Sequence, residues 1–299
     1  MLIQPGLVSV IIPTYNQSRL LREAIDSALA QTYGPLEVIV VDDGSTDDTP
    51  QQCATYGDRI HYIRRANGGT AAARNTALAA ARGEFVALLD HDDCWLPTKI
   101  EKQVLCMGTD PRIGMVHTAG RVVDRDTGRT TSVFAAAPDQ DYHDLLTWCK
   151  VSCASVMMRQ SALETVGLFD ESLPGVDDWD MWIRLAWAHR VVGLAEELTE
   201  IREHGKNQGG SYARMFPLVR QAIIKRRPEH ANCDACLAAR RAALRQLRRD
   251  YFAKALNRAG RIRSQGGLWP ALVVVVDGVR KYPEAIARLP RRALMELLG

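Results

Sequence analysis

Three short apolar runs near the start of the chain constrain its fold more than any other feature. They are Val8–Pro13, Glu37–Val41 and Glu84–Asp90, and each consists almost wholly of β-branched or other apolar residues. Nearly continuous apolar runs of this length are typical of strands that are buried on both faces, as in the centre of a parallel sheet. The sequence therefore predicts at least three central strands.

Helical patterns separate these runs. Ser18–Gln31 places its apolar residues on one face, and Ser18 is a candidate cap. Ser45 and Asp48 have the spacing of a capping box. Ala71–Arg82 is alanine-rich and is followed by Gly83, a residue type that commonly ends helices. The alternation predicts an α/β fold with a doubly wound, mostly parallel sheet and a helical C-terminal extension.

Polar residues follow each predicted strand. The three segments are Thr14–Asn16, Asp42–Gly44 and Asp90–Asp93. Ligands bind at the carboxyl ends of the strands in such sheets. Carboxylates gathered there would repel one another unless a cation or buried donors compensated them. The sequence therefore predicts a ligand site at this edge.

Three common nucleotide and metal motifs are absent. No G-x-G-x-x-G follows Pro13, and no G-x-x-x-x-G-K-[ST] occurs anywhere in the chain. The acidic segment Asp42–Asp48 lacks the ligand order of an EF-hand. These absences argue against the usual dinucleotide cradle, a P-loop and an EF-hand.

The charge of the chain is uneven. Residues 220–299 contain 18 Lys and Arg against 6 Asp and Glu, a balance of +12, whereas residues 1–219 contain 20 against 29, a balance of −9. The acidic front suits a metal site, and the basic tail suits an anionic surface. We expect two parts, a catalytic domain over 1–212 and a helical, Arg-rich extension over 213–299.

Five segments in order carry a family resemblance. They are VSVIIPTYN (8–16), EVIVVDDGSTDDT (37–49), NGGTAAARN (67–75), GEFVALLDHDD (83–93) and VDDWDMWIRLA (176–186). Together they resemble the inverting family 2 glycosyltransferases, which have the GT-A fold. The resemblance covers residues 7–212 and says little about the last third.

The resemblance implies a nucleotide-diphosphate sugar as donor, which we take to be a UDP-sugar. It places Pro13, Thr14 and Tyr15 against the base and ribose, and it gives Asp43 a hydrogen bond to the base. Asp42 and Asp43 also suit an Asx-turn before Gly44, and one of them can serve each purpose. The resemblance places two further residues near the nucleotide, namely Gly69 and Arg74.

A divalent cation, Mn²⁺ or Mg²⁺, is also implied. Such ions prefer oxygen ligands and can neutralise a leaving diphosphate. By resemblance Asp92 is the direct ligand, Asp90 lies near the ribose or the waters of the metal, and His204 completes the site. A second interpretation is that Asp90 and Asp93 cap a helix that begins near residue 97.

The catalytic base is expected on the acceptor side, because inversion requires removal of a proton from the attacking hydroxyl. By position in the resemblance this base is Asp178. A simpler interpretation is that Asp177–Asp180 form the acidic first turn of a helix. Trp179 and Trp182 suit a sugar platform, although buried packing is the commoner role of tryptophan.

The seven cysteines are an odd number, and the first residues lack a charged region and a cleavage site. We therefore expect reduced thiols in a cytoplasmic protein. Cys233 and Cys236 have the spacing of metal ligands, but only His230 lies nearby in the sequence. Because structural zinc requires four ligands, two free thiols are the favoured interpretation.

The basic tail predicts a membrane contact in preference to nucleic acid. Its arginines are spread around one helix without interleaved aromatic residues, so we expect no nucleic-acid binding. Attachment to the inner face of an anionic membrane is favoured, with a shallow apolar contact from Leu268, Trp269, Leu272 and Val273. A solvated helix, packing on the core or a dimer contact are the alternatives.

The sequence therefore predicts a metal-dependent glycosyltransferase that acts on a glycan or glycolipid of a cell-surface polymer. Two other functions remain open. A nucleotidyltransferase on a similar fold would need a basic phosphate loop after the first strand, which Thr14–Ser18 does not provide. A catalytically silent sugar-nucleotide binder would not need both Asp92 and Asp178.

Overall fold

The computed structural model describes residues 2–203, 212–225, 233–264 and 268–281. The chain divides into two compact units, Met1–Asn207 and Gln208–Gly299.

The first unit contains one ten-stranded sheet. Eight of its strands lie side by side in the order β3-β2-β1-β4-β9-β6-β10-β5. Its strands are β1 (Gln4–Thr14), β2 (Leu36–Asp42), β3 (His61–Arg64), β4 (Gly83–Leu88), β5 (Cys94–Trp95), β6 (Ile113–Asp124), β7 (Thr130–Phe134), β8 (Asp139–Gln140), β9 (Met157–Arg159) and β10 (Arg190–Glu203). The first four strands in this order are parallel. Beyond them β9 is antiparallel to β4 and β6, β10 is parallel to β6, and β5, β7 and β8 add short antiparallel pairings.

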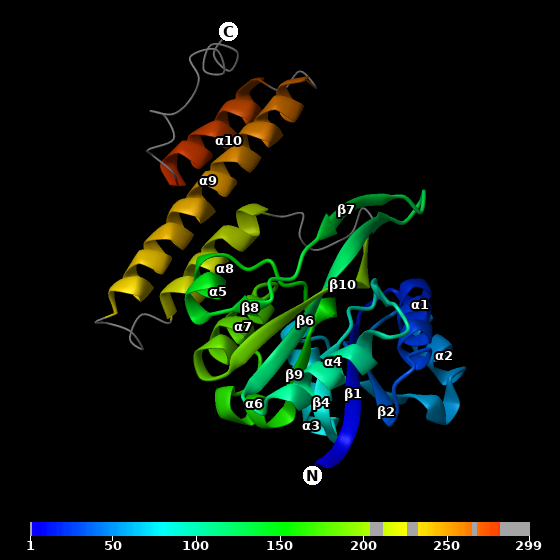
Figure 1. The fold of residues 1–299 in the computed structure, drawn as a ribbon. Coiled ribbons are helices and arrows are strands. Elements are labelled where there is room, and N and C mark those ends of the chain that lie inside the picture. The colour runs from blue at the N-terminus through cyan, green and yellow to red at the C-terminus, as the bar shows by residue number, and fades with distance from the viewer. Residues whose placement is uncertain (1, 204–211, 226–232, 265–267, 282–299) are drawn as a thin grey trace. The chain divides into compact units, whose positions relative to one another are not determined.

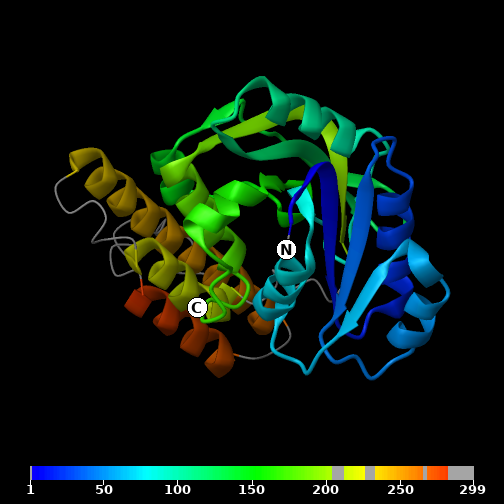
Figure 2. The same cartoon turned by 90° about the horizontal axis from the view of Figure 1, so that it is seen from below.

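Helices cover both faces of this sheet, as the predicted doubly wound fold requires. They are α1 (Ser18–Leu29), α2 (Thr49–Ala54), α3 (Thr70–Ala80), α4 (Lys99–Thr109), α5 (Tyr142–Thr147), α6 (Gln160–Val166) and α7 (Asp177–Ala188). Figure 2 shows α1 and α2 on one face of the parallel strands and α3 on the other. Each βα connection therefore opens at the same edge of the sheet.

Strand β1 is the centre of the core. Val10 and Ile12 are fully buried in a cluster that includes Leu21 and Ile25 of α1. Ile11, between them, is equally buried and faces the other side, because successive side chains in a strand alternate. Full burial of such a side chain contributes about 1.5–3 kcal/mol. The apolar run Val8–Pro13 is therefore buried on both faces, as the sequence predicts.

Two predicted helix caps are wrong. Ser18 is the first residue of α1 and its hydroxyl hydrogen-bonds Asp48, while Gln17 occupies the cap position. The capping box does not form either, because α2 begins after Asp48 and Ser45 Oγ accepts from the Asn16 amide at 2.9 Å. Both serines tie the loop after β1 to the loop after β2. Contacts between loops therefore replace local capping here.

The predicted role of Gly83 is also wrong. It begins β4 and does not end α3, which stops at Ala80. A Cβ at this position would lie 2.7 Å from Leu7 O and from Ser9 N. Glycine is required because β1 and β4 approach closely at this point.

The second unit is helical in its described parts. Helices α8 (Tyr212–Lys225), α9 (Asp234–Ser264) and α10 (Leu268–Lys281) pack with α9 against both others (Figure 1). The rings of Phe216 and Tyr251 meet edge to face with centroids 4.7 Å apart, which fastens α8 to α9. Among the described residues, none of the helices combines the length and the apolarity that a bilayer span requires.

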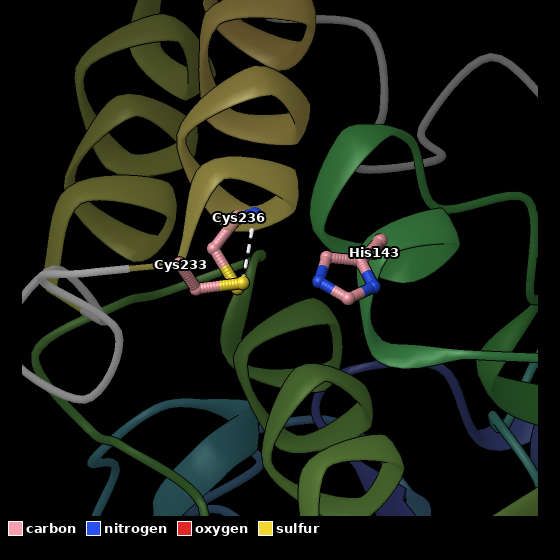
Figure 3. A group of neighbouring side chains, drawn as sticks. All are labelled: His143, Cys233 and Cys236. Carbon is pink, nitrogen blue, oxygen red and sulfur yellow. Dashed lines mark hydrogen bonds between the residues drawn. The ribbon is translucent and has the colours of Figure 1, made fainter.

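All seven cysteines are described, and none of them forms a disulfide bond. At the start of α9 the amide of Cys236 donates to Cys233 Sγ at 3.4 Å (Figure 3), which gives this thiol a helix-capping role. His230 lies outside the described residues.

The close approach at Gly83 can be tested by substitution. Gly83→Ala should lower the free energy of unfolding by about 1–3 kcal/mol, because the new methyl group has no room. Gly108→Ala on α4 is the control, since a Cβ there meets nothing within 4 Å. It should leave stability unchanged or raise it by up to about 1 kcal/mol. Chemical denaturation measures both, and equal midpoints for the two variants would contradict the packing.

Candidate active site

The polar ends of β1, β2 and β4 meet at one edge of the sheet. β1 lies between the other two strands. The Asp43 amide donates to Thr14 O at 2.9 Å, and His91 Nδ1 lies 3.1 Å from Pro13 O. The three segments predicted to form a ligand site are therefore joined to one another through the end of β1.

Asp42 is a turn residue. Its wholly buried carboxylate accepts from the Ser45 amide at 2.7 Å and from the Tyr62 hydroxyl at 2.6 Å. Burial and this hydrogen bond raise the pKa of Tyr62, so the hydroxyl stays a donor. Of the two neighbouring aspartates, Asp42 is thus the one that shapes the turn.

Asp43 holds the loop before α3. Its carboxylate accepts from the amides of Gly68 at 3.0 Å and Gly69 at 2.7 Å, and Arg65 Nε lies 3.3 Å away. A negative charge is favoured at a helix N-terminus, where amides lack partners. Gly69 has φ +91°, a conformation that favours glycine. The structure thus brings Asp43 and Gly69 together.

The end of β1 presents one exposed aromatic ring. Tyr15 is 46% exposed, whereas Pro13 and Thr14 are buried. Thr14 Oγ1 has no hydrogen-bond partner among the described residues. Asn16 adopts φ 51°, and its side chain accepts from the Thr46 amide at 2.7 Å. These contacts fix the backbone next to Tyr15.

Arg74 joins two acidic segments that lie far apart in the sequence. Its guanidinium donates from NH1 to Asp177 Oδ2 at 2.8 Å and from NH2 to Asp90 Oδ1 at 2.9 Å. Arg74 is 5% exposed, and its third nitrogen is buried with no partner among the described residues. The bridge connects the end of β4 to the start of α7. Both terminal nitrogens contact carboxylates, and the predicted contact of Arg74 with a nucleotide stays a prediction.

The acidic residues of α7 have different surroundings. Asp177 is buried on Arg74 and also accepts from the Gly175 amide at 3.1 Å. Asp180 is buried and pairs with Arg184 at 2.9 Å. Asp178 is only partly buried, and its carboxylate accepts from the Trp179 amide at 2.7 Å. All three lie in the first turn, where the helix dipole favours acids.

Asp178 has the electrostatics of a proton acceptor. Burial raises its pKa to about 6, and the neighbouring charge of Asp177 adds to the effect, while Arg74 opposes it. A pKa near neutrality is what a general base requires, because the group is ionised at pH 7 yet still binds a proton readily.

The two tryptophans that follow Asp178 most closely differ in burial. Trp182 is fully buried, so of the two roles that the sequence left open it has the commoner one and belongs to the core. Trp179 is partly buried and donates from Nε1 to Leu145 O at 2.6 Å. Its ring meets the edge of Trp148 with centroids 6.1 Å apart. These contacts join Trp148 to Trp179, the residue that directly follows Asp178.

Arg202 on β10 holds the segment that follows β4, a role that the sequence did not reveal. Its amide donates to Asp93 Oδ1 at 3.1 Å, and its Nε donates to Asp92 O at 2.8 Å. It also pairs with Glu23 on α1. The interpretation of Asp90 and Asp93 as helix caps is wrong, because Thr98 precedes the first residue of α4.

The carboxylates after β4 suit a divalent cation. Asp90 and Asp92 are partly exposed and offer oxygen atoms, the ligands that Mn²⁺ and Mg²⁺ prefer. Burial, together with the charges of Asp92 and Asp90, raises the pKa of Asp93. His204, the other predicted ligand, lies outside the described residues. The donor set that the structure describes is therefore compatible with the predicted metal.

The Arg74 bridge predicts a large stability effect. Arg74→Met should lower the free energy of unfolding by about 3–5 kcal/mol, because Asp177 would remain buried and charged without its partner. Arg22→Met is the matched control, since Arg22 and its ion-pair partner Asp26, 3.8 Å away, are both more than half exposed. Its loss should cost about 0–1 kcal/mol. Equal losses in urea denaturation would contradict the bridge.

Curated relatives match up to about two thirds of the chain. An uncharacterised glycosyltransferase of Rickettsia typhi is 36% identical over 212 residues, which cover 66% of this chain and 64% of that protein. An Escherichia coli protein named UDP-Glc:alpha-D-GlcNAc-diphosphoundecaprenol beta-1,3-glucosyltransferase WfaP is 34% identical over 183 residues, 60% of this chain and 70% of that protein. The chain thus spans just under two thirds of the Rickettsia typhi relative.

Solved structures share the fold. S. aureus TarS 1-349 in complex with UDP-GlcNAc aligns with a TM-score of 0.66 and 20% identity, covering 96% of this chain and 82% of that one. The mannosyltransferase PcManGT from Pyrobaculum calidifontis, in complex with GDP-Man and Mn²⁺, aligns with a TM-score of 0.58 and 21% identity, covering 97% and 78%. At this identity the likeness concerns the fold, and it confirms the predicted GT-A architecture.

The family model described as "Glycosyl transferase family 2" matches residues 9–167. This range includes the ends of β1, β2 and β4 and the Arg74 helix, and α7 follows it. The family predicted from the five sequence segments is confirmed. The chain belongs to glycosyl transferase family 2.

Proposed function

We propose that this protein is an inverting, metal-dependent glycosyltransferase that moves a sugar from a UDP-sugar to a hydroxyl of a glycan or glycolipid during cell-surface polysaccharide synthesis. The observation that carries the proposal is the Arg74 bridge. It joins the D-x-D segment at the end of β4 to the acidic turn that holds Asp178. A donor-binding edge and a proton acceptor are therefore parts of one connected site.

The names of two relatives support the donor and the acceptor class. WfaP and WfgD of Escherichia coli are named as UDP-Glc glucosyltransferases that act on a diphosphoundecaprenol-linked GlcNAc, and they are 34% and 32% identical to this chain. A lipid-linked sugar is accordingly the acceptor class that we favour. The donor sugar of this chain is proposed only as far as its UDP group.

The donor half would bind the nucleotide at the end of β1. The Tyr15 ring is exposed and supplies an aromatic surface for a base. Asp43 has lone pairs beyond those used by Gly68 and Gly69, since a carboxylate offers about four acceptor positions. One of them would suit the N–H of a uracil ring. Pro13 and Thr14 fix the position of both residues through the end of the strand.

The residues after β4 would hold the metal. Asp92 is the proposed ligand, with His204 as a second, and Asp90 beside it is oriented by Arg74. When bound, the ion supplies positive charge that stabilises the departing diphosphate. Arg202 fixes the backbone of this segment through the carbonyl of Asp92 and the carboxylate of Asp93. Both arginines thus keep the carboxylates in place.

The acceptor half would supply the base. Inversion by a single displacement requires a proton acceptor opposite the leaving group. Asp178 is the partly exposed acid of the turn, whereas Asp177 and Asp180 are occupied by arginines. Its oxygen would take the proton of the attacking hydroxyl as the new glycosidic bond forms. Trp179 directly follows Asp178 and contacts the ring of Trp148, and this aromatic pair would offer a surface for a sugar ring.

The first prediction of this proposal concerns the metal. Asp92→Asn should keep the fold and lower Mn²⁺-dependent UDP affinity at least tenfold, because a carboxylate ligand becomes a neutral amide. Asp58→Asn, an exposed aspartate on the turn before β3, is the control. Isothermal titration of UDP with and without Mn²⁺ measures the effect. Unchanged affinity in a folded Asp92 variant would remove this residue from the metal site.

The second prediction concerns the base and its pH dependence. Asp178→Asn should lower turnover by about 10²–10⁴-fold with little change in UDP affinity. In the native protein turnover should fall as the pH drops through about 6, because protonated Asp178 cannot accept a proton. Donor-hydrolysis and transfer assays across pH measure both effects, with exposed Asp126→Asn as control.

Several described groups interact electrostatically with Asp178 and bear on this pH profile. They are the charged Asp177, Arg74 and Asp90, and the thiols Cys149 and Cys153. Burial raises the pKa of both thiols, so they remain neutral throughout the range tested. If Asp178→Asn keeps near-normal turnover, another residue is the base. The same conclusion follows if the variant keeps some activity and its turnover still falls at acidic pH as in the native protein.

A further inference from the structure

Helix α10 exposes a narrow apolar line that ends in a cation. Trp269, Val273 and Val276 are 78%, 66% and 61% exposed, and Arg280 is exposed one turn later. Spacings of four, three and four residues place these side chains on one face of a helix. We call these four residues the α10 stripe. Large apolar side chains gathered on one exposed face commonly mark an interaction site.

The other side of α10 is already occupied. A Cβ on Gly278 would lie 3.0 Å from Ala255 and 3.2 Å from the ring of Phe252, so this side packs closely on α9. Asp277, which is the only acidic residue of α10, hydrogen-bonds Tyr251 of α9. The negative charge of the helix is therefore directed to its neighbour, and the stripe carries only apolar groups and a cation.

The charge of this unit indicates what the stripe contacts. Residues 220–299 have a charge balance of +12. The exposed cations of α9 that contribute to it include Arg241, Arg249 and Lys254. The same helices of a second copy would bring the same positive charge to this surface and would be repelled. An anionic lipid surface complements it, because cations attract lipid headgroups and a tryptophan suits the boundary between water and hydrocarbon.

We propose that α10 lies in the plane of an anionic membrane with the α10 stripe toward the lipid. From Trp269 to Arg280 the stripe is about 16 Å long at about 1.5 Å per residue, which suits a helix at the surface of a bilayer. Trp269, Val273 and Val276 enter the headgroup boundary. Arg280 and the α9 cations stay among the anionic headgroups. The sequence predicted Trp269 and Val273 for this contact, and the structure adds Val276, while the side chains of Leu268 and Leu272 lie outside those described.

The test uses the full chain and vesicles of two compositions. Co-sedimentation is measured with phosphatidylglycerol–phosphatidylcholine vesicles and with pure phosphatidylcholine vesicles, at low and high salt. We expect binding to the anionic vesicles that weakens at least tenfold in high salt, since screening shortens the reach of surface charges. We expect no binding to the neutral vesicles. Absence of binding to anionic vesicles at low salt would overturn the proposal.

Variants separate the stripe from the general charge of the tail. Trp269→Ser combined with Val273→Ser and Val276→Ser should weaken binding to anionic vesicles at least tenfold. Trp187→Ser is the matched control, because this tryptophan is 54% exposed on α7 of the first unit. Arg280→Glu should also weaken binding and flatten its salt dependence. Wild-type binding by the folded triple variant would overturn the proposal.

Two further measurements complete the test. Circular dichroism confirms that each variant is folded, and if the triple variant is not, Trp269→Ser and Arg280→Glu decide the outcome alone. Size-exclusion chromatography with light scattering measures the oligomeric state. A dimer that dissociates in the stripe variants, without vesicle binding by the native chain, would make the stripe a contact between copies and overturn the membrane proposal. None of these readouts depends on transfer activity.

Discussion

The buried guanidinium of Arg74 fixes the end of β4 and the start of α7 relative to one another. Arg74 lies on a helix that follows β3, and it contacts one carboxylate after β4 and another at the start of α7. A charge buried to this extent persists only when it is paired, and each carboxylate likewise needs the cation. The pairing therefore fixes where α7 begins relative to the sheet, and with it the place of Asp178. Arg202 supports the same segment from β10.

The strands and the sheet edge were predictable because their signal is local. Runs such as Val8–Pro13 are buried on both faces, and polar residues such as Asp43 and Asp90 directly follow them. Their arrangement at one edge follows from parallel pairing. Asp178 was predicted as the base only through resemblance, because an acidic first turn has an ordinary explanation in the helix dipole.

The remaining features depend on contacts that sequence spacing does not encode. Arg74 and Asp177 are 103 positions apart, and nothing near either residue indicates the other. The caps predicted at Ser18 and Ser45 failed for the same reason, since hydrogen bonds between two loops replaced local ones. Trp182 could not be assigned to core or surface until the burial of α7 was known.

The change from parallel to mixed pairing beyond β4 has a consequence for how such a protein can diversify. The residues proposed to bind the nucleotide lie on β1, β2 and the helix after β3, whereas the region from residue 125 to residue 176 belongs to the other half of the sheet. Described polar links such as the Arg74 bridge join the two halves at the site. Insertions or replacements in the later loops can therefore reshape the acceptor side while leaving the nucleotide side intact. The architecture allows one donor chemistry to be combined with many acceptors.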